Sequence, residues 1–475
     1  MLVFTLLLIL IDERLIMQKQ REHWGSQIGF ILAALGSAVG LGTLWKFPYM
    51  TGANGGGFFV LIYLACIFLI GIPLFMAELS LGRKAQRGAV GVFVELSNGS
   101  AFWKGIGWLG VASSFLIMTY YATIAGWGLN YALMSLNQVF SNRSPEEIAG
   151  LFEKVKTSAD INLFWHLAFT GLAVSVVYPG VRAGIEFWSR IMTSTLLVML
   201  IGLFLYCTTL DGFGKAVSFV LYPDASKFKP SGVLEALGLA FFTLSLGQGI
   251  MLTYGSYMRK EDDIPKTGLV VGFGILIVAI LASLTIFPIV FTFGGKPEAG
   301  PGLVFQTLPL LFAKLPGSLL ISTTFFSLFV FTGLTSAIAL VEVVAANFMD
   351  LLGWSRKKAV LITGAACFIV GIPSALSWTG VIFPEWIDIY GKTFFETIDD
   401  LVTVWMIPVC GFFITLYAGW FIDSKVIKDE LLAGTAWKFL YKPWIFLIRY
   451  LAPVGIVFIF LQKAEIINID HLFGV

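Results

Sequence analysis

Three glycines interrupt the first apolar run of this chain that is long enough to cross a lipid bilayer. Residues 28–50 are apolar enough to span the hydrocarbon, yet Gly36, Gly40 and Gly42 fall within seven positions near its centre. Glycine is costly inside a continuous helix, so the sequence predicts a helix that is broken at mid-membrane. Backbone groups left unpaired at that depth must be satisfied by protein, water or a bound ligand. The break is therefore a candidate binding site.

The composition predicts that most of the remaining chain is also embedded in lipid. Of the 475 residues, 57% are hydrophobic and only 13% are charged, which leaves too little polar surface to cover a soluble globule. We therefore expect an all-α polytopic membrane protein with the lipid bilayer as its main surroundings. Eleven apolar segments each predict a transmembrane helix: residues 28–50, 57–81, 106–137, 163–180, 185–208, 232–257, 267–292, 317–348, 358–375, 395–421 and 443–462.

Charge and residue types exclude several classes of function. The net charge is +2 and no basic patch is interleaved with aromatic residues, so nucleic acid is not an expected partner. None of the three histidines has an acidic residue or another histidine at a spacing typical of a catalytic or metal site, so no enzyme activity is expected. The four cysteines fall in or beside apolar segments, which predicts buried thiols without disulfides.

Lysine and arginine are more frequent in the loops that face the cytosol when the N-terminus is placed there. The positive-inside rule thus predicts a multi-pass protein of the cell inner (plasma) membrane with a cytoplasmic N-terminus. Residues 1–20 are expected to form a cytosolic or membrane-surface tail. The apolar stretch at 2–11 is too short to span and no small-residue cleavage site follows it, so residues 1–16 are excluded from the fold.

A second apolar segment is interrupted in the same manner as the first. Residues 241–249, FFTLSLGQG, place glycines and hydroxyls inside the sixth segment, five segments after the first interruption. Two broken helices in matching positions of two halves are typical of transporters built from inverted repeats, with a binding site at the bilayer midplane. The sequence therefore predicts two repeats of five helices, over 21–210 and 211–422, and an eleventh helix within 423–475.

The eighth apolar segment carries three hydroxyl side chains close together, those of Thr332, Thr335 and Ser336. Such hydroxyls often bond to carbonyls one turn earlier in their own helix, and this alternative stays open. Hydroxyl and carbonyl oxygens also suit an alkali cation, and the two interrupted helices favour that function. We therefore expect an ion site at this segment.

Ordered motifs along residues 21–463 resemble the neurotransmitter:sodium symporter family, in particular its bacterial amino-acid transporters. The motifs are REHW at 21–24, GSAVGLGTLWKFP at 36–48, NGGG at 54–57, GIP at 71–73, YY at 120–121, FFTLSLG at 241–247, GLVF at 302–305 and GLTS at 333–336. The resemblance implies the leucine-transporter fold, in which helices 1 and 6 are broken and substrate crosses by alternating access.

The resemblance also implies how a substrate carboxylate is held. It would meet the backbone N–H groups of Leu41 and Gly42, where the start of a half-helix favours an anion, and the hydroxyl of Tyr121. Monoamine carriers of the family have an aspartate at the position of Gly40, so the glycine favours a substrate that brings its own carboxylate. We expect an amino acid.

The remaining substrate contacts implied by the resemblance fall into two groups. The amino group would face the carbonyls of Ala38, Phe242 and Thr243, with Ser245 nearby. The side-chain pocket would be lined by Ile117, Tyr121, Phe242, Gln248, Ser336 and Leu340. Because most of these pocket residues are apolar, we expect a neutral, mainly hydrophobic amino acid.

Of the two sodium sites known in the family, the resemblance implies that one is retained. Its oxygens would be the carbonyls of Gly36, Val39 and Thr332 and the hydroxyls of Thr335 and Ser336. The second site has Thr43 in place of its asparagine in the first helix, and Ile275 in place of its polar ligand in the seventh. An isoleucine cannot solvate a buried cation, so we predict coupling to a single sodium ion and no chloride site.

Two polar side chains near the second interruption are of interest. The resemblance implies that Glu78, which lies in an apolar helix and needs a partner, braces the break in helix 6. Gln248 stands where the bacterial leucine carrier has an aromatic residue. It either reads a polar atom of the substrate or braces the same break, and the sequence leaves both open.

The family closes its pathway at both ends with charged pairs. The outer pair would be Lys46 and Asp399, and since lysine lacks the planar fork of arginine we expect a water-bridged contact. The inner pair would be Arg21 and Asp350, with Trp24 packed beside it.

The function that these features predict is a sodium-coupled symporter that imports a neutral amino acid. One alternative is a carrier of the same fold that is driven by protons, because one sodium site is damaged. A second is a sensor that binds amino acids without transporting them.

Overall fold

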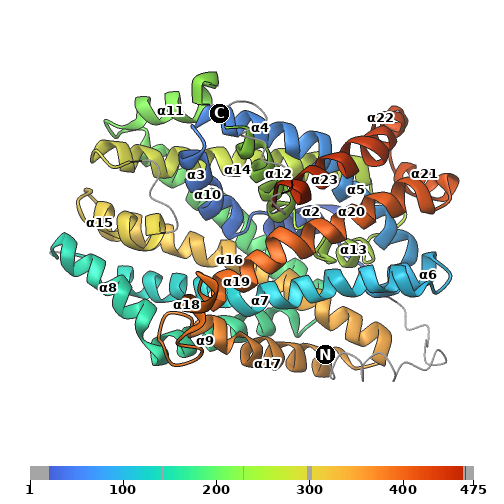
Figure 1. The fold of residues 1–475 in the computed structure, drawn as a ribbon, viewed down its shortest axis with the longest axis horizontal. Helices are drawn as coiled ribbons and strands as arrows, with labels where there is room; N and C mark the ends of the chain where they lie inside the picture. Colours follow the sequence, from blue (N-terminus) through green and yellow to red (C-terminus); the bar gives the residue numbers. More distant parts are fainter. Residues whose placement is uncertain (1–20, 142, 228, 297–301, 464–465, 467–475) are drawn as a thin grey trace.

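The computed structural model describes residues 21–463 and 466, apart from 142, 228 and 297–301. Within these residues every regular element is a helix, and the long helices run roughly parallel to the longest axis of the molecule (Figure 1). The all-α fold class is as predicted. The predicted tail at 1–20 lies outside the described residues.

Nine of the described helices are long and apolar enough to cross a membrane, by length and composition. They cover Gly57–Ala85 (with α4, Gly57–Cys66, and α5, Ile72–Ala85), Ala101–Leu136 (α7), Ala159–Val177 (α9), Val181–Cys207 (with α10, Phe187–Cys207), Ile264–Thr292 (α14), Ser318–Leu352 (α16), Arg356–Ala375 (α17), Phe394–Phe421 (with α19, Phe394–Asp400, and α20, Ile407–Leu416) and Lys438–Gln462 (with α22, Tyr441–Phe446, and most of α23, Ala452–Lys463). A tenth span is formed by α2 (Gln27–Ala38) and the segment Gly42–Ala53 with α3 (Phe47–Ala53), which bend by 51° at a break. A total of eleven requires that α12 (Pro230–Thr243) and α13 (Ile250–Gly255) form one further span, and it stays a prediction.

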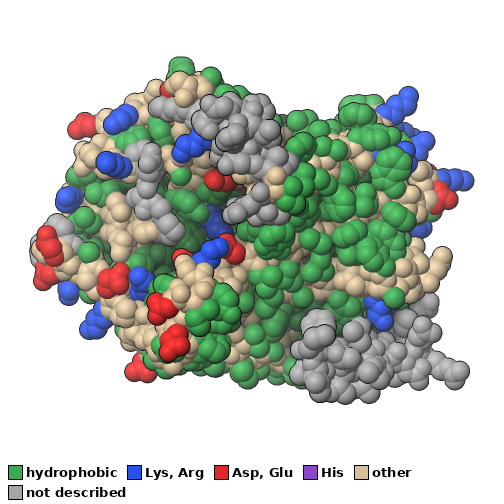
Figure 2. All heavy atoms as spheres, viewed as in Figure 1, with side chains coloured by type: hydrophobic (Ala, Val, Ile, Leu, Met, Phe, Trp, Pro, Cys, Tyr) green, Lys and Arg blue, Asp and Glu red, His purple; other side chains and the backbone are tan. Residues whose placement is uncertain are grey.

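The core lies along α7 and α16, and the lipid-facing surface lies on the outer helices. The most apolar window of α16 is 94% buried inside the protein, against 33% for that of Val181–Cys207. Small residues allow the close approach: a Cβ on Gly128 of α7 would lie 2.6 Å from the ring of Phe329, and one on Gly333 of α16 would lie 3.2 Å from the methyl of Ala125. Figure 2 shows hydrophobic side chains across the middle of the molecule and charged ones gathered at its two ends. This distribution matches a bilayer that surrounds the middle.

Both predicted interruptions are present. The helix α2 ends at Ala38, and helical structure resumes at Leu41 after two residues. Between α12 and α13 the backbone takes positive φ angles at Ser245, Gly247 and Gly249. A Cβ on Gly247 would lie 2.4 Å from the carbonyl oxygen of Ile407, so this turn requires glycine both for its φ angle and for space.

Candidate functional site

The two interruptions contact each other directly. The hydroxyl of Ser245 lies 3.2 Å from the carbonyl oxygen of Ser37, to which it donates, and 3.3 Å from the hydroxyl of Ser37. Beside this contact, the breaks enclose a cavity together with α7 and α16. The cavity is lined by Ser37, Ala38, Gly40, Leu41, Gly42, Ile117, Tyr121, Phe242, Thr243, Ser245, Gln248, Ile250, Ser336 and Leu340.

All eleven residues predicted to contact substrate line this one cavity. That they bind a substrate stays a prediction. Sequence reasoning missed Ser37 and Ile250 as lining residues, and assigned Gly40 only a role in leaving space. Each of these residues is adjacent in sequence to a residue at one of the two breaks, and that position could have identified it as lining the cavity.

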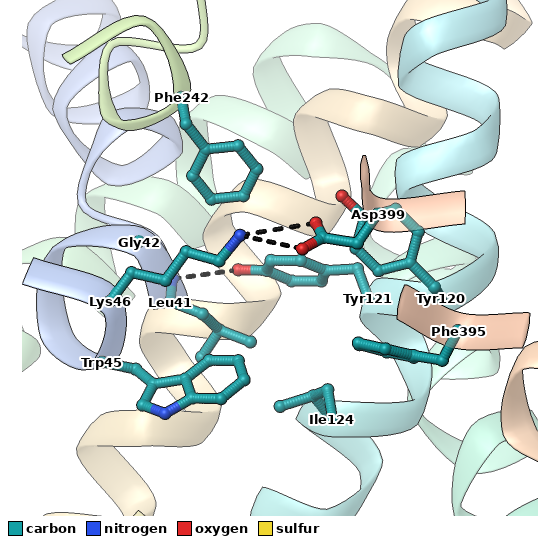
Figure 3. A pocket seen from close by; sticks show the side chains of 10 residues that line it. All are labelled: Leu41, Gly42, Trp45, Lys46, Tyr120, Tyr121, Ile124, Phe242, Phe395 and Asp399. Atoms are coloured by element: carbon teal, nitrogen blue, oxygen red, sulfur yellow. Dashed lines mark hydrogen bonds and ion pairs between the residues drawn. The ribbon is translucent and has the colours of Figure 1, made fainter. Parts of the chain in front are cut away.

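The predicted carboxylate seat is built by the first break and α7. The buried Tyr121 of α7 accepts a hydrogen bond at its hydroxyl from the backbone N–H of Leu41, at 3.2 Å (Figure 3). A Cβ on Gly40 would lie 2.6 Å from the hydroxyl of Ser336, and one on Gly42 would lie 2.7 Å from the ring of Phe242. The glycines therefore allow α16 and α12 to approach this backbone closely.

Of the predicted sodium residues, Gly36, Thr335 and Ser336 lie where α2 meets α16. A Cβ on Gly36 would lie 3.2 Å from the Cβ of Thr335, so the two backbones are in close contact. The Ser336 hydroxyl donates to the carbonyl oxygen of Ser37 at 2.9 Å, which ties the two helices at the break. Val39 is the first residue after α2, and it is 1% exposed. Among the described residues no group of three or more His, Cys, Asp or Glu side chains could hold a metal.

Two of the three predicted hydroxyls of α16 also bond to carbonyls one turn earlier in their own helix, which is the alternative that the sequence left open. The Thr332 hydroxyl donates to Leu328 at 2.7 Å, and the Thr335 hydroxyl donates to Phe331 at 3.0 Å, both one turn earlier in α16. These bonds leave the lone pairs of the hydroxyl oxygens available to a cation. The carbonyl of Thr332, which was the predicted ligand, accepts from Thr335 at 3.1 Å.

The residues that the sequence assigned to a second, weakened sodium site bond to other groups of the protein or are apolar. The hydroxyl of Thr43 donates to the carbonyl oxygen of Ala38 at 3.2 Å. The hydroxyl of Thr243 lies 2.7 Å from that of Tyr63 and donates to its own helix at Leu239, at 2.9 Å. Ile275, on α14, is fully buried and brings no polar atom in its side chain. This region is poor in free oxygen ligands.

Lys46 and Asp399 line a second pocket, which shares Leu41, Gly42, Tyr121 and Phe242 with the cavity between the breaks. The ammonium of Lys46 lies 3.1 and 3.4 Å from the two carboxylate oxygens, and 4.8 Å from the centre of the Phe242 ring (Figure 3). The prediction of a water-bridged contact is therefore wrong. The aromatic face supports the ammonium by a cation–π interaction and holds it within direct reach of both oxygens.

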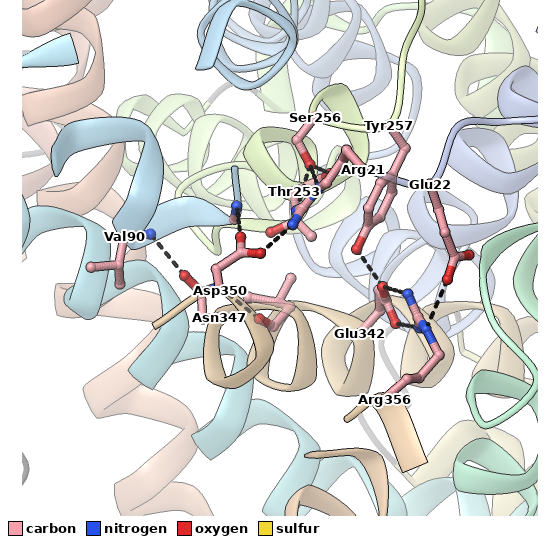
Figure 4. Close-up of polar contacts among 12 residues, drawn as sticks. Arg21, Glu22, Val90, Thr253, Ser256, Tyr257, Glu342, Asn347, Asp350 and Arg356 are labelled. Carbon is pink, nitrogen blue, oxygen red and sulfur yellow. Dashed lines mark hydrogen bonds and ion pairs between the residues drawn. The ribbon is translucent and has the colours of Figure 1, made fainter. Parts of the chain in front are cut away.

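Arg21 and Asp350 form a second ion pair, at the C-terminal end of α16. The guanidinium lies 2.5 Å from the carboxylate, donates to the Ser256 hydroxyl at 2.7 Å and stacks 4.6 Å from the Tyr257 ring centre (Figure 4). Burial alone would lower the pKa of Arg21, but Tyr257, Asp350 and Glu342 raise it above its ordinary value, so this group is charged.

Trp24 packs against the ring of Tyr257, which also contacts the guanidinium of Arg21. It is 1% exposed, and its indole N–H donates to the carbonyl of Tyr254 at 3.1 Å. Its backbone N–H donates to the carbonyl of Tyr257 at 3.1 Å. The start of the first helix is thereby fixed to the segment that follows the second break.

A second ionic cluster at the same end was not predicted as functional. Glu342 of α16 is fully buried, accepts from Tyr257 at 2.5 Å and pairs with Arg356 at 2.8 and 3.1 Å (Figure 4). Arg356 also lies 3.3 Å from Glu22, ahead of α2. The sequence signal was an acidic residue inside an apolar helix, but its partners are distant in the chain.

Two further carboxylates hold the interrupted helices. Glu78 accepts from the backbone N–H of Gly247 at 2.8 Å, so the prediction that it braces the second break is confirmed. Glu186, directly ahead of α10, accepts from the backbone N–H of Gly25 at 2.6 Å and pairs with Arg190 at 3.1 Å. The bond to Gly25 links the start of α10 to the segment ahead of the first span.

Comparisons with known proteins agree with this architecture. The family model described as the sodium:neurotransmitter symporter family matches residues 21–147 and 146–471. An uncharacterized sodium-dependent transporter of Bacillus subtilis, YhdH, is 39% identical over 95% of this chain and 99% of its own. A sodium-dependent transporter of Haemophilus influenzae is 32% identical over 94% of this chain and 98% of its own.

A solved structure shares the fold at high similarity. The crystal structure of MhsT in complex with L-phenylalanine has a TM-score of 0.85 and 40% identity, and covers 93% of this chain and 99% of its own. Together with the family match, this likeness confirms the predicted family. The chain is a multi-pass membrane protein that belongs to the sodium:neurotransmitter symporter family.

Proposed function

We propose that this protein is a symporter that imports a neutral amino acid together with sodium, by alternating access around the cavity between the two breaks. The observation that carries the proposal is the direct contact of the two interruptions, Ser245 with Ser37, beside the cavity that both breaks line. Backbone groups left unpaired by a break inside a membrane protein suit a polar solute and its cation.

The cavity favours a zwitterion with an uncharged side chain. The N–H groups of Leu41 and Gly42 stand at the start of a half-helix, where a carboxylate is stabilised. None of the described residues that line the cavity carries a charge, and Ile117 and Leu340 are apolar. A charged side chain would lose its hydration here without a partner. The L-phenylalanine complex of MhsT supports an amino acid with an uncharged side chain.

We infer one sodium ion for each substrate. The retained site would use the carbonyls of Gly36, Val39 and Thr332 and the hydroxyls of Thr335 and Ser336. At the second site, the Thr43 hydroxyl already donates to the Ala38 carbonyl, and the side chain of Ile275 has no oxygen that could bind a cation. With one cation fewer there is less charge to compensate, and we expect no requirement for chloride.

Alternating access would open one end at a time. The Lys46–Asp399 pair would close the outer end and the Arg21–Asp350 pair the cytoplasmic end, in a protein of the inner (plasma) membrane whose N-terminus is cytoplasmic. Lys46 joins the first span to α19 at 3.1 Å, and Arg21, in the segment ahead of α2, joins that segment to α16 at 2.5 Å. Opening either end requires that the first span move away from its partner.

The test is uptake of labelled neutral amino acids into proteoliposomes, with sodium, proton and potential gradients imposed separately. We expect accumulation that requires an inward sodium gradient. Accumulation that persists without sodium and follows a pH gradient would instead support the proton-driven alternative, which the loss of polar ligands at Ile275 favours. Sodium-dependent binding without accumulation would support the sensor.

A further inference from the structure

We propose that Gln248 makes this carrier selective for neutral amino acids whose side chain ends in a hydrogen-bonding group, such as a carboxamide. The inference rests on the proposed function, because it assumes that the cavity between the breaks holds an amino acid. It names which neutral side chains the site prefers.

The first step is that the second break does not need the Gln248 side chain. Its backbone groups already have partners from other residues: Glu78 accepts from the N–H of Gly247 at 2.8 Å, and Ser114 of α7 donates to the carbonyl of Gln248 at 2.6 Å. The N–H of Leu246 donates within the turn to Phe241 at 3.0 Å. The role of Gln248 as a brace, which the sequence left open, therefore belongs to its backbone carbonyl.

The second step is that the side chain is buried with an unused donor. Gln248 is 3% exposed and lines the cavity. Its side-chain nitrogen has no hydrogen-bond partner among the described residues. A buried polar group without a partner costs free energy, and a ligand that supplies the partner recovers it. The arrangement therefore favours a ligand with an acceptor at this place.

The third step concerns the chemistry of that ligand. The apolar side chains of Ile117, Ile250 and Leu340 suit the methylene part of a side chain. An amide both donates and accepts, so a carboxamide on the substrate complements the amide of Gln248. A carboxylate is disfavoured because no described cavity residue is cationic. Glutamine and asparagine have the predicted chemistry.

The experiment measures calorimetric binding of two shape-matched ligand pairs to the purified full-length protein in saturating sodium. Glutamine is compared with methionine, and asparagine with leucine. For the unmodified protein we expect the amide of each pair to bind at least about tenfold more tightly than its apolar counterpart, because the apolar ligand leaves the Gln248 amide unpaired. In Gln248→Met the preference should invert, and retained methionine binding would demonstrate that this variant is folded.

The matched control is Gln27→Met. Gln27 also has a buried side-chain nitrogen without a partner among the described residues, but it lies at the start of α2, away from the cavity. This variant should keep the preference of the unmodified protein. If the unmodified protein prefers methionine and leucine, or if Gln248→Met weakens all four ligands equally, the inference is overturned. If none of the four ligands binds in sodium, the proposed function fails and the inference with it.

Discussion

The two regions where a cation could accompany the substrate differ in the number of oxygen atoms that could serve as its ligands. Where α2 meets α16, the hydroxyls of Thr335 and Ser336 lie against the end of a broken helix. On the other side of the first break, Thr43 bonds to the Ala38 carbonyl and Ile275 presents only carbon. Under the proposed coupling to a single sodium ion, the side chains at positions 43 and 275 set the number of ions, while both broken helices are retained.

The largest effect is expected for a substitution where α2 meets α16, the region with more oxygen ligands. Thr335→Val keeps the shape of the side chain and removes the hydroxyl, so the affinity for sodium in sodium-driven uptake should fall about a hundredfold. The control is Thr285→Val, which removes a buried hydroxyl that donates to Leu281 at 2.8 Å, outside the cavity. An unchanged sodium affinity in Thr335→Val would remove this residue from the sodium site.

The second-largest effect is expected for a double substitution that adds oxygen ligands to the region that has fewer of them. Thr43→Asn combined with Ile275→Asn supplies two amide oxygens, and the Hill coefficient of sodium-dependent uptake should rise from about 1 toward about 2. Each single substitution should leave it near the lower value, since one added oxygen does not complete a ligand set. A coefficient already near two in the unmodified protein would contradict the account.

A smaller effect is expected for removing the hydroxyl of Thr43 alone. In Thr43→Val the Ala38 carbonyl loses its donor, but no sodium ligand is lost from the α2 and α16 region. The sodium affinity, read from uptake at graded sodium concentrations, should change less than about threefold. A loss comparable to that of Thr335→Val would mean that the two regions act as one site.

The smallest effect is expected for chloride. Replacing chloride with gluconate on both sides of the membrane should change the initial rate of uptake less than about twofold. Uptake that stops without chloride would indicate an anion site that the present ligand set does not explain.

Much of the fold could be predicted because a bilayer allows few solutions. Spans need about twenty apolar residues, and the glycines between Gly36 and Gly42 could only be tolerated at a break. The cavity-lining residues followed from the family resemblance, because the motifs fix their order along both broken helices.

The remaining features depend on contacts that no local pattern encodes. The direct Lys46–Asp399 pair requires the ring of Phe242 beneath the ammonium, and that ring comes from another helix. The Glu342–Arg356 pair joins two helices, and its link to Glu22 spans most of the chain. A sequence pattern identifies a buried carboxylate as needing a partner, but only the packed structure names that partner.

The most direct test of single-ion coupling is the reversal potential of sodium-driven uptake in proteoliposomes. Membrane potential is varied at fixed sodium and amino-acid gradients until net flux of the labelled substrate is zero. The account predicts a balance point set by one sodium ion and one positive charge for each zwitterionic substrate. A balance point that requires two sodium ions would contradict it.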